Sequence, residues 1–134
     1  WPGYFGTLTR LLKPGARACV QSIVIDDALF ERYVQGTDFI QQYVFPGGCL
    51  PSPARFRAAA QQAGLRVVEE LAFGADYAET LRRWHRKFTQ EHAQVLAQGF
   101  DAKFLRTWEF YLGYCEAAFD SNNINVVQYT LVKD

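Results

Sequence analysis

The chain has 134 residues, of which 49% are hydrophobic and 16% aromatic, so it can bury the core of one ordinary domain. Its 14 basic and 14 acidic residues cancel to a formal net charge of zero, which excludes a global basic field for nucleic acid. No apolar run approaches the roughly 20 residues of a membrane-spanning helix, and no basic-then-apolar secretion signal opens the sequence. Methionine is absent throughout, so we interpret the sequence as part of a longer protein.

Apolar spacing and turn residues predict the elements in chain order. Helices are indicated where apolar side chains recur every three or four residues, and strands where Val and Ile concentrate. Ser52-Pro53 is a typical helix start, and Asp76 with Glu79 three residues later predicts a capping box. The expected elements are a helix over 1–12, a strand over 17–25, a helical turn over 28–36, a helix from 53 to 63, a strand over 65–73, a helix from 76 to about 98, a further helix begun at Asp101, and a strand over 124–132.

Alternation of helices with strands indicates a layered α/β sheet. The strand over 17–25 is apolar enough to be buried on both faces. Gln21 and Ser22 lie near its carboxyl end, where open α/β sheets bind ligands. The two consecutive helices before the last strand predict an insertion that covers one edge of the sheet. Three strands are too few for a complete doubly wound domain.

The stretch from Asp38 to Ser52, DFIQQYVFPGGCLPS, is the least generic part of the sequence. Proline and paired glycines at Pro46-Gly47-Gly48 predict a tight turn. Five large apolar side chains precede that turn, which is unusual for a surface connection. The pattern leaves two interpretations open: the turn packs onto the core, or it lines an apolar pocket.

The cysteines and histidines do not predict a metal site. Cys19, Cys49 and Cys115 stand singly, and His85 and His92 are two helical turns apart without a third candidate ligand nearby. An odd number of cysteines without a spacing pattern is typical of a reducing cytoplasm.

Five segments together resemble one family. They read LLKPGARACVQSIVIDD, DFIQQYVFPGGCLPS, FGADYAETLRRW, WEFYLGYCEAAF and INVVQYTL, and they cover nearly the whole chain. The chain is similar to the carboxyl-terminal half of the cyclopropane-fatty-acyl-phospholipid and mycolic acid cyclopropane synthases, which are S-adenosylmethionine-dependent lipid methyltransferases. The FPGGCLPS block is the most specific of these motifs, whereas LKPG before a strand occurs in many methyltransferases.

The resemblance implies the α/β fold of a class I methyltransferase, with a seven-stranded sheet and a two-helix insertion before the last strand. Residues 1–134 would form the carboxyl-terminal part of that single domain. The glycine-rich loop for S-adenosylmethionine and an active-site glutamate would lie in the amino-terminal half, and no GxGxG-type stretch occurs here. This piece alone is therefore expected to be inactive.

The resemblance also implies site residues. Family members methylate the cis double bond of an unsaturated phospholipid acyl chain, and a bound bicarbonate removes a proton to close a cyclopropane. Tyr77 matches a family tyrosine that helps hold the bicarbonate, and the first turn of a helix independently favours an anion. Ile23 matches a position whose backbone faces the bicarbonate. Gln21 replaces a family histidine and cannot carry a proton near neutral pH, which favours a methyl- or methylene-branched product as the alternative.

The aromatic stripes admit two interpretations, core packing or an acyl tunnel. Tyr43, Phe45, Trp84, Phe104 and Tyr111 are the tunnel candidates. The basic run Arg82–Lys87 is either a solvated helix face or a contact for anionic headgroups. We expect a cytoplasmic protein peripheral to the membrane, without nucleic acid, and a fragment that self-associates as a possible homo-oligomer. A lipid- or partner-binding module without catalysis is the interpretation from another class.

Overall fold

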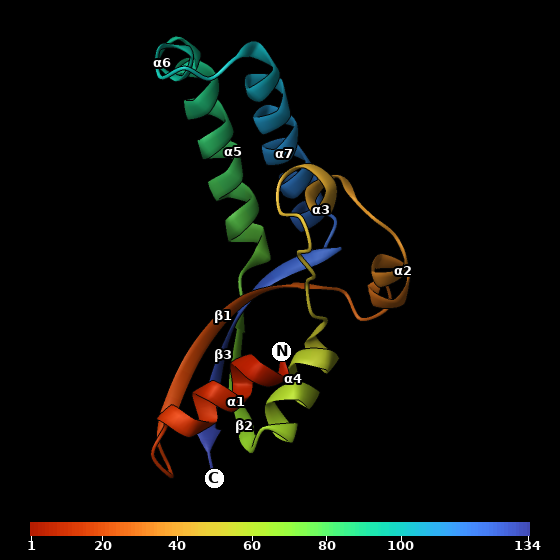
Figure 1. Cartoon of the computed structure of the whole chain (residues 1–134), viewed down its shortest axis with the longest axis vertical. Coiled ribbons are helices and arrows are strands. Elements are labelled where there is room, and N and C mark those ends of the chain that lie inside the picture. The colour runs from red at the N-terminus through yellow and green to blue at the C-terminus, as the bar shows by residue number, and fades with distance from the viewer.

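The computed structural model describes residues 1–134, which form seven helices and a three-stranded sheet (Figure 1). Helices α1 and α4 lie beside the sheet, while α5 and α7 project from one end of it as a long hairpin closed by α6 (Figure 1). In chain order the elements are α1 (Pro2–Leu11), β1 (Arg17–Ile25), α2 (Phe30–Gln35), α3 (Phe39–Tyr43), α4 (Pro53–Gln62), β2 (Leu65–Ala72), α5 (Gly74–Gln90), α6 (His92–Ala97), α7 (Ala102–Asp120) and β3 (Ile124–Lys133).

Strand β3 is central, and β1 and β2 pair with it on either side, each antiparallel. Side chains alternate between the two faces of a strand. Val20 and Val24 of β1 therefore face one layer, while Gln21 and Ile23 face the other. In the pairing register Ile23 lies opposite Val126, which places both at the end of the sheet from which the hairpin rises.

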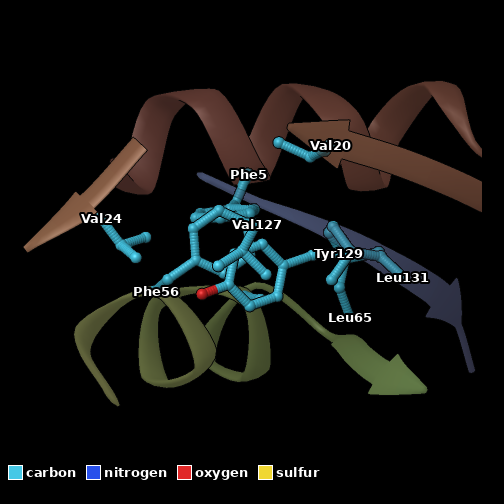
Figure 2. Close-up of a cluster of buried hydrophobic side chains, with 9 residues drawn as sticks. Phe5, Val20, Val24, Phe56, Leu65, Val127, Tyr129 and Leu131 are labelled. Atoms are coloured by element: carbon cyan, nitrogen blue, oxygen red, sulfur yellow. The ribbon is translucent and has the colours of Figure 1, made fainter. Parts of the chain in front are cut away.

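The larger core lies between the sheet and helices α1 and α4. The rings of Phe56 and Tyr129 stack with their centroids 3.9 Å apart, and Phe5 meets Phe56 edge-on at 5.1 Å (Figure 2). This layer consists of buried apolar residues from five elements: Phe5, Val20, Val24, Phe56, Ala60, Leu65, Val127, Tyr129 and Leu131.

A second core joins the hairpin to the opposite face of the sheet. It contains Ala78, Leu81, Leu112, Cys115, Phe119 and Val126. The junction is fixed by Asn125, whose Oδ1 accepts hydrogen bonds from the backbone N–H of Gly74 at 2.8 Å and of Val126 at 2.9 Å. A Cβ on Gly74 would lie 2.5 Å from that oxygen, so only glycine fits the start of α5.

Most of the predicted elements are confirmed, and four details are corrected. Asp76 does not cap α5, because the helix begins at Gly74 and Asn125 binds that N–H from a distant strand. The helix also ends at Gln90 rather than near 98, with α6 as a separate turn. The hairpin packs on the face of central strand β3, not over an edge. Strand β1 is not buried on both faces, since Cys19 and Gln21 are exposed.

Candidate functional site

A cleft of about 960 Å³ lies between α5, α7, the segment around α3 and the end of the sheet. Sixteen of its 22 lining residues are hydrophobic, which makes it an apolar site of the size that holds a drug-sized ligand. Along α5 the lining extends from Tyr77 near the sheet to Glu91 at the end of the helix. At the helical rise of 1.5 Å per residue, that wall is about 21 Å long.

The segment after α3 forms one wall of the cleft and is held there by side chains. Asp38 and Gln41 form a reciprocal capping box at the start of α3. Gln41 also donates from Nε2 to the carbonyl oxygen of Gly48 at 3.0 Å, and the Tyr33 hydroxyl accepts from the N–H of Leu50 at 3.0 Å. The chain turns at Gly47, where φ is +78°. Of the two open interpretations, the pocket lining is the one observed, because Phe45 and Gly48 both line the cleft.

Tyr77 lies in the first turn of α5 at the sheet end of the cleft. Its ring contacts Phe119 at 5.1 Å and Trp84 at 6.0 Å between centroids. No protein group in the chain hydrogen-bonds its hydroxyl. The Tyr77 hydroxyl is therefore free to bind a ligand.

Tyr111 and Cys115 lie one turn apart on α7 and form the opposite wall. Burial raises the pKa of Tyr111 to about 12, and the neighbouring Cys115 adds to the rise. Burial likewise raises the pKa of the Cys115 thiol to about 11. Both groups are consequently neutral at physiological pH, and this wall of the cleft carries no charge.

Two of the three predicted catalytic residues line the cleft, and Gln21 does not. Ile23 contributes to the lining beside Tyr77. Gln21 shares the sheet face of Ile23 but lies two residues before it on β1, about 6.6 Å away, and does not line the cleft. Its Oε1 accepts a hydrogen bond from Gln128 Nε2 at 3.0 Å, and the side chain is exposed. The three residues thus do not converge within this chain.

Three of the five predicted tunnel residues, Phe45, Trp84 and Tyr111, line the cleft. Tyr43 is 64% exposed and lies outside it, because residues 39 and 43 share the face of α3 that turns toward Phe110 of α7. Phe104 also lies outside the lining but stacks on Trp108, which does line the cleft, at 5.7 Å.

Sequence reasoning missed Trp108 and Cys115 as cleft residues. Both lie on the predicted apolar face of the last helix, so their helical spacing indicated burial but not which element they would face. Tyr33 was also missed, since its contact with Leu50 spans 17 residues of loop and short helix.

The basic run on α5 is largely ion-paired. Arg82 contacts Glu116 at 3.0 Å and Asp120 at 2.9 Å on α7, and Arg83 contacts Glu79 at 2.9 Å. Lys87 contacts Glu91 at 3.2 Å. The two pairs of Arg82 join α5 to α7, whereas those of Arg83 and Lys87 are local to α5 and its C-cap; all of them lie at the surface, which fits the solvated-face interpretation. No helix is long and apolar enough to cross a membrane, and no cluster of three metal-binding side chains is present.

Comparison with solved structures identifies the class of fold. The chain superposes on the mycolic acid cyclopropane synthase CmaA1 in complex with SAH and CTAB with a TM-score of 0.87 at 24% sequence identity. The alignment covers 98% of this chain and 49% of that chain. The α/β fold is therefore that of S-adenosylmethionine-dependent methyltransferases, in their carboxyl-terminal half, and the predicted fold class is confirmed.

Sequence comparison identifies the family. Residues 1–129 match the family described as Mycolic acid cyclopropane synthetase, and the chain belongs to this family. It is 41% identical to the tuberculostearic acid methyltransferase UfaA1 of Mycobacterium tuberculosis, over 100% of this chain and 32% of that protein. It is 32% identical to the cyclopropane-fatty-acyl-phospholipid synthase of Escherichia coli K12, over 93% of this chain and 31% of that protein. The chain thus spans about a third of the length of these relatives.

Proposed function

We propose that the protein containing this chain transfers a methyl group to the cis double bond of an unsaturated fatty acyl chain of a phospholipid. The observation that carries the proposal is the long apolar cleft with the unpartnered Tyr77 hydroxyl at its sheet end. The names of two relatives support it, a tuberculostearic acid methyltransferase and a cyclopropane-fatty-acyl-phospholipid synthase.

An acyl chain fits the chemistry of the cleft. Each buried methylene gains about 0.8 kcal/mol, and an apolar wall leaves no polar group unsatisfied. The cleft wall is about 21 Å long, compared with about 15 Å for one leaflet of a bilayer hydrocarbon core of roughly 30 Å. An acyl chain of that length fits along α5 within the wall that extends from Glu91 to Tyr77.

The cofactor implied by the family is S-adenosylmethionine, which when bound supplies an electrophilic methyl group. The sequence holds no glycine-rich loop for it, so we place most of its site outside these residues. The residues of this chain bind the acyl chain, exclude water and face the reacting carbons with aromatic rings. The rings of Tyr77, Trp84 and Tyr111, which line the cleft, would stabilise positive charge that develops on the acyl chain when it is methylated.

A proton must then leave the cationic chain. Tyr77 is placed to hold a proton acceptor by hydrogen bonding from its hydroxyl. Bicarbonate is the acceptor that the family resemblance implies. Of the three residues predicted for it, only Tyr77 offers a side-chain donor to the cleft, so this chain alone does not form that site and we assign no step to it.

Two products are possible, and we favour a methyl- or methylene-branched chain over a cyclopropane. Gln21 stands where the resemblance expects a histidine, and identity to the tuberculostearic acid methyltransferase is 41%, compared with 32% to the cyclopropane synthase. Cyclopropane formation is the second candidate, because the same cation gives a ring when the transferred methyl group loses a proton and bonds to the neighbouring carbon, whereas a hydride shift within the chain before that proton loss gives a methylene branch.

The test is conversion of a monounsaturated phospholipid by the full-length protein with S-adenosylmethionine. A methylene-branched chain and a cyclopropane both gain the mass of one CH₂ group, so mass alone shows methyl transfer but not which of these forms; a saturated methyl branch would be two hydrogens heavier and would need a separate reductant. Mild catalytic hydrogenation of the product adds hydrogen to a methylene branch and leaves a cyclopropane ring intact. Unchanged lipid mass with folded, cofactor-loaded protein would refute the proposed function.

A further inference from the structure

The far end of the hairpin exposes apolar side chains without charge. Residues 92–100, HAQVLAQGF, contain no Asp, Glu, Lys or Arg, although both flanking helices are rich in them. Leu96 is 45% exposed and Phe100 is 46% exposed. We call Leu96, Phe100 and the intervening turn the hairpin tip, which lies at the opposite end of the molecule from α1 (Figure 1).

Positive charge is available next to the hairpin tip. Of the nearby acids, Glu91 pairs with Lys87 and Glu109 lies 3.1 Å from His92, whereas Asp101 caps α7 through the N–H of Phe104 at 2.8 Å and keeps its negative charge. Lys103 and Arg106 are exposed and form no ion pair. An apolar tip beside unpaired cations is complementary to the surface of an anionic bilayer.

A continuous row of aromatic rings connects the hairpin tip with the cleft. Phe100 stacks on Phe104 at 4.4 Å, Phe104 on Trp108 at 5.7 Å, and Trp108 contacts Tyr111 at 4.8 Å between centroids. The last two residues line the cleft. The row therefore offers an uninterrupted apolar surface from solvent-exposed Phe100 to the wall opposite Tyr77.

We infer that the hairpin tip docks into the interface of an anionic phospholipid bilayer and that one acyl chain passes along the aromatic row into the cleft. The inference rests on the proposed function, because it supplies the route by which that substrate leaves the membrane. It places Leu96 and Phe100 among the acyl chains, with Lys103 and Arg106 at the level of the headgroups. The occupant is a lipid surface rather than an acyl-carrying protein.

The first test is cosedimentation of the full-length protein with vesicles of phosphatidylcholine containing phosphatidylglycerol, without S-adenosylmethionine. Leu96→Asp with Phe100→Asp is expected to weaken binding at least about tenfold. Lys103→Ala and Arg106→Ala should each weaken it about fivefold on anionic vesicles and leave the weaker binding to pure phosphatidylcholine unchanged. The matched control is Leu11→Asp on α1, where a 70% exposed leucine lies far from the hairpin tip and should leave binding unaltered.

A second measurement separates docking from catalysis. The doubly substituted tip variant should lose turnover on vesicles but retain it on the same lipid dispersed in detergent. Failure of the unaltered protein to bind vesicles, or unchanged binding by the tip variant, would overturn the docking inference and favour delivery by a carrier protein. If the unaltered protein turns over neither the vesicle lipid nor the lipid dispersed in detergent, the proposed function is refuted. The cosedimentation result would still show whether the hairpin tip binds the bilayer.

Discussion

Three tyrosines line the cleft, and their hydroxyl groups have different surroundings. Tyr33 accepts a hydrogen bond from Leu50 and holds the loop after α3. Tyr111 lies beside Cys115, where burial raises its pKa to about 12. Tyr77 has no partner in the chain, although it begins the long helix that forms the cleft wall. Of the three, Tyr77 is therefore the one whose hydroxyl is available for chemistry.

Tyr77→Phe in the full-length protein is expected to lower turnover by about a hundredfold, the lower end of the range for losing a group that positions a proton transfer. Its melting temperature should change little, since no protein hydrogen bond is lost. Tyr33→Phe serves as the matched control: it leaves the N–H of Leu50 without its acceptor and should cost about 1 kcal/mol of stability. Equal turnover in the Tyr77 variant and the unaltered protein would make Tyr77 merely structural.

Tyr129 is buried in the core and does not line the cleft. It is 0% exposed, its ring stacks on Phe56, and its hydroxyl has no hydrogen-bond partner among protein groups (Figure 2). Burial raises the pKa of Tyr129 to about 12. Below pH 10 the phenol is protonated in both folded and unfolded chains, so its contribution is constant there. Between about pH 10 and 12 the unfolded chain releases the proton and the folded chain does not, so the free energy of unfolding falls as pH rises.

Tyr129→Phe should therefore be neutral or slightly stabilising at pH 7, because an unsatisfied buried hydroxyl is removed. It should also reduce the alkaline loss of stability by up to about 2–3 kcal/mol. Chemical denaturation at pH 7 and at pH 11 measures both effects, and Tyr4→Phe, at a 52% exposed position, is the control. A Phe variant with the same alkaline decline as the unaltered protein would contradict the assignment.

At the scale of elements, the junction between α5 and the sheet depends on one glycine. Gly74→Ala would place a Cβ 2.5 Å from the Asn125 oxygen that binds two backbone N–H groups. The expected loss is about 1–3 kcal/mol, since the side chain must move and the helix start loses its acceptor. The matched control is Gly113→Ala within α7, where nothing lies within 4 Å of the added carbon and a gain of about 0.5–1 kcal/mol is expected. Urea denaturation of both variants measures the difference, and equal stability of the two would contradict it.

Local signals predicted the elements well where the signal and the contact lie close together in sequence. Ser52 caps α4 through the N–H of Arg55, with Pro53 at the first helical position, as expected. Asp101 caps α7 in the same way. The start of α5 was misplaced because its capping side chain, Asn125, lies 51 residues away. The break between α5 and α6 was missed because no glycine or proline marks residues 90–92.

The candidate site was predicted only in part, because several of its contacts join elements that are far apart in sequence. Spacing placed Trp84 and Tyr111 on apolar helix faces, and the family resemblance singled out Tyr77, all of which line the cleft. Alternation along β1 put Gln21 on the same face as Ile23, but it could not show how far the hairpin extends over the sheet. The exposed position of Tyr43 likewise depends on which face of α3 meets α7.

At the scale of the whole molecule, the charged side chains of the hairpin lie on its two long helices and not at its tip. The ion pairs of Arg82 and Arg83 lie along α5, whereas the hairpin tip has no charge. Exposed ion pairs add little stability individually, typically about 0–1 kcal/mol. Ion pairs therefore cover the side of the hairpin where Arg82 meets α7, while apolar surface lies at its end and along the aromatic row, with Trp84 and Phe110 also exposed along its length.

The sheet itself is open, because β1 and β2 each have one edge without a strand partner. Exposed apolar groups accompany these edges, with Val68 38% and Leu71 58% exposed on β2. Unpaired backbone N–H and C=O groups beside apolar side chains favour pairing with another chain. We therefore expect the isolated 134-residue chain to self-associate, and sedimentation equilibrium should detect species heavier than its 15.3 kDa monomer.

The association should depend on the edges rather than on disulfides, so the measurement is made under reducing conditions, since Cys19 and Cys49 are exposed free thiols. Val68→Lys with Leu71→Lys should shift the chain toward monomer, because charges on an edge strand oppose pairing. Leu11→Lys, which adds one positive charge at an exposed site away from the sheet edges, should not, and Leu71→Lys alone is the variant that matches it in charge. If the unaltered chain is a monomer at every concentration, the open edges are protected by their own twist and charge. If the Val68→Lys, Leu71→Lys variant and the Leu11→Lys variant associate equally, the contact between chains lies elsewhere than at the sheet edges.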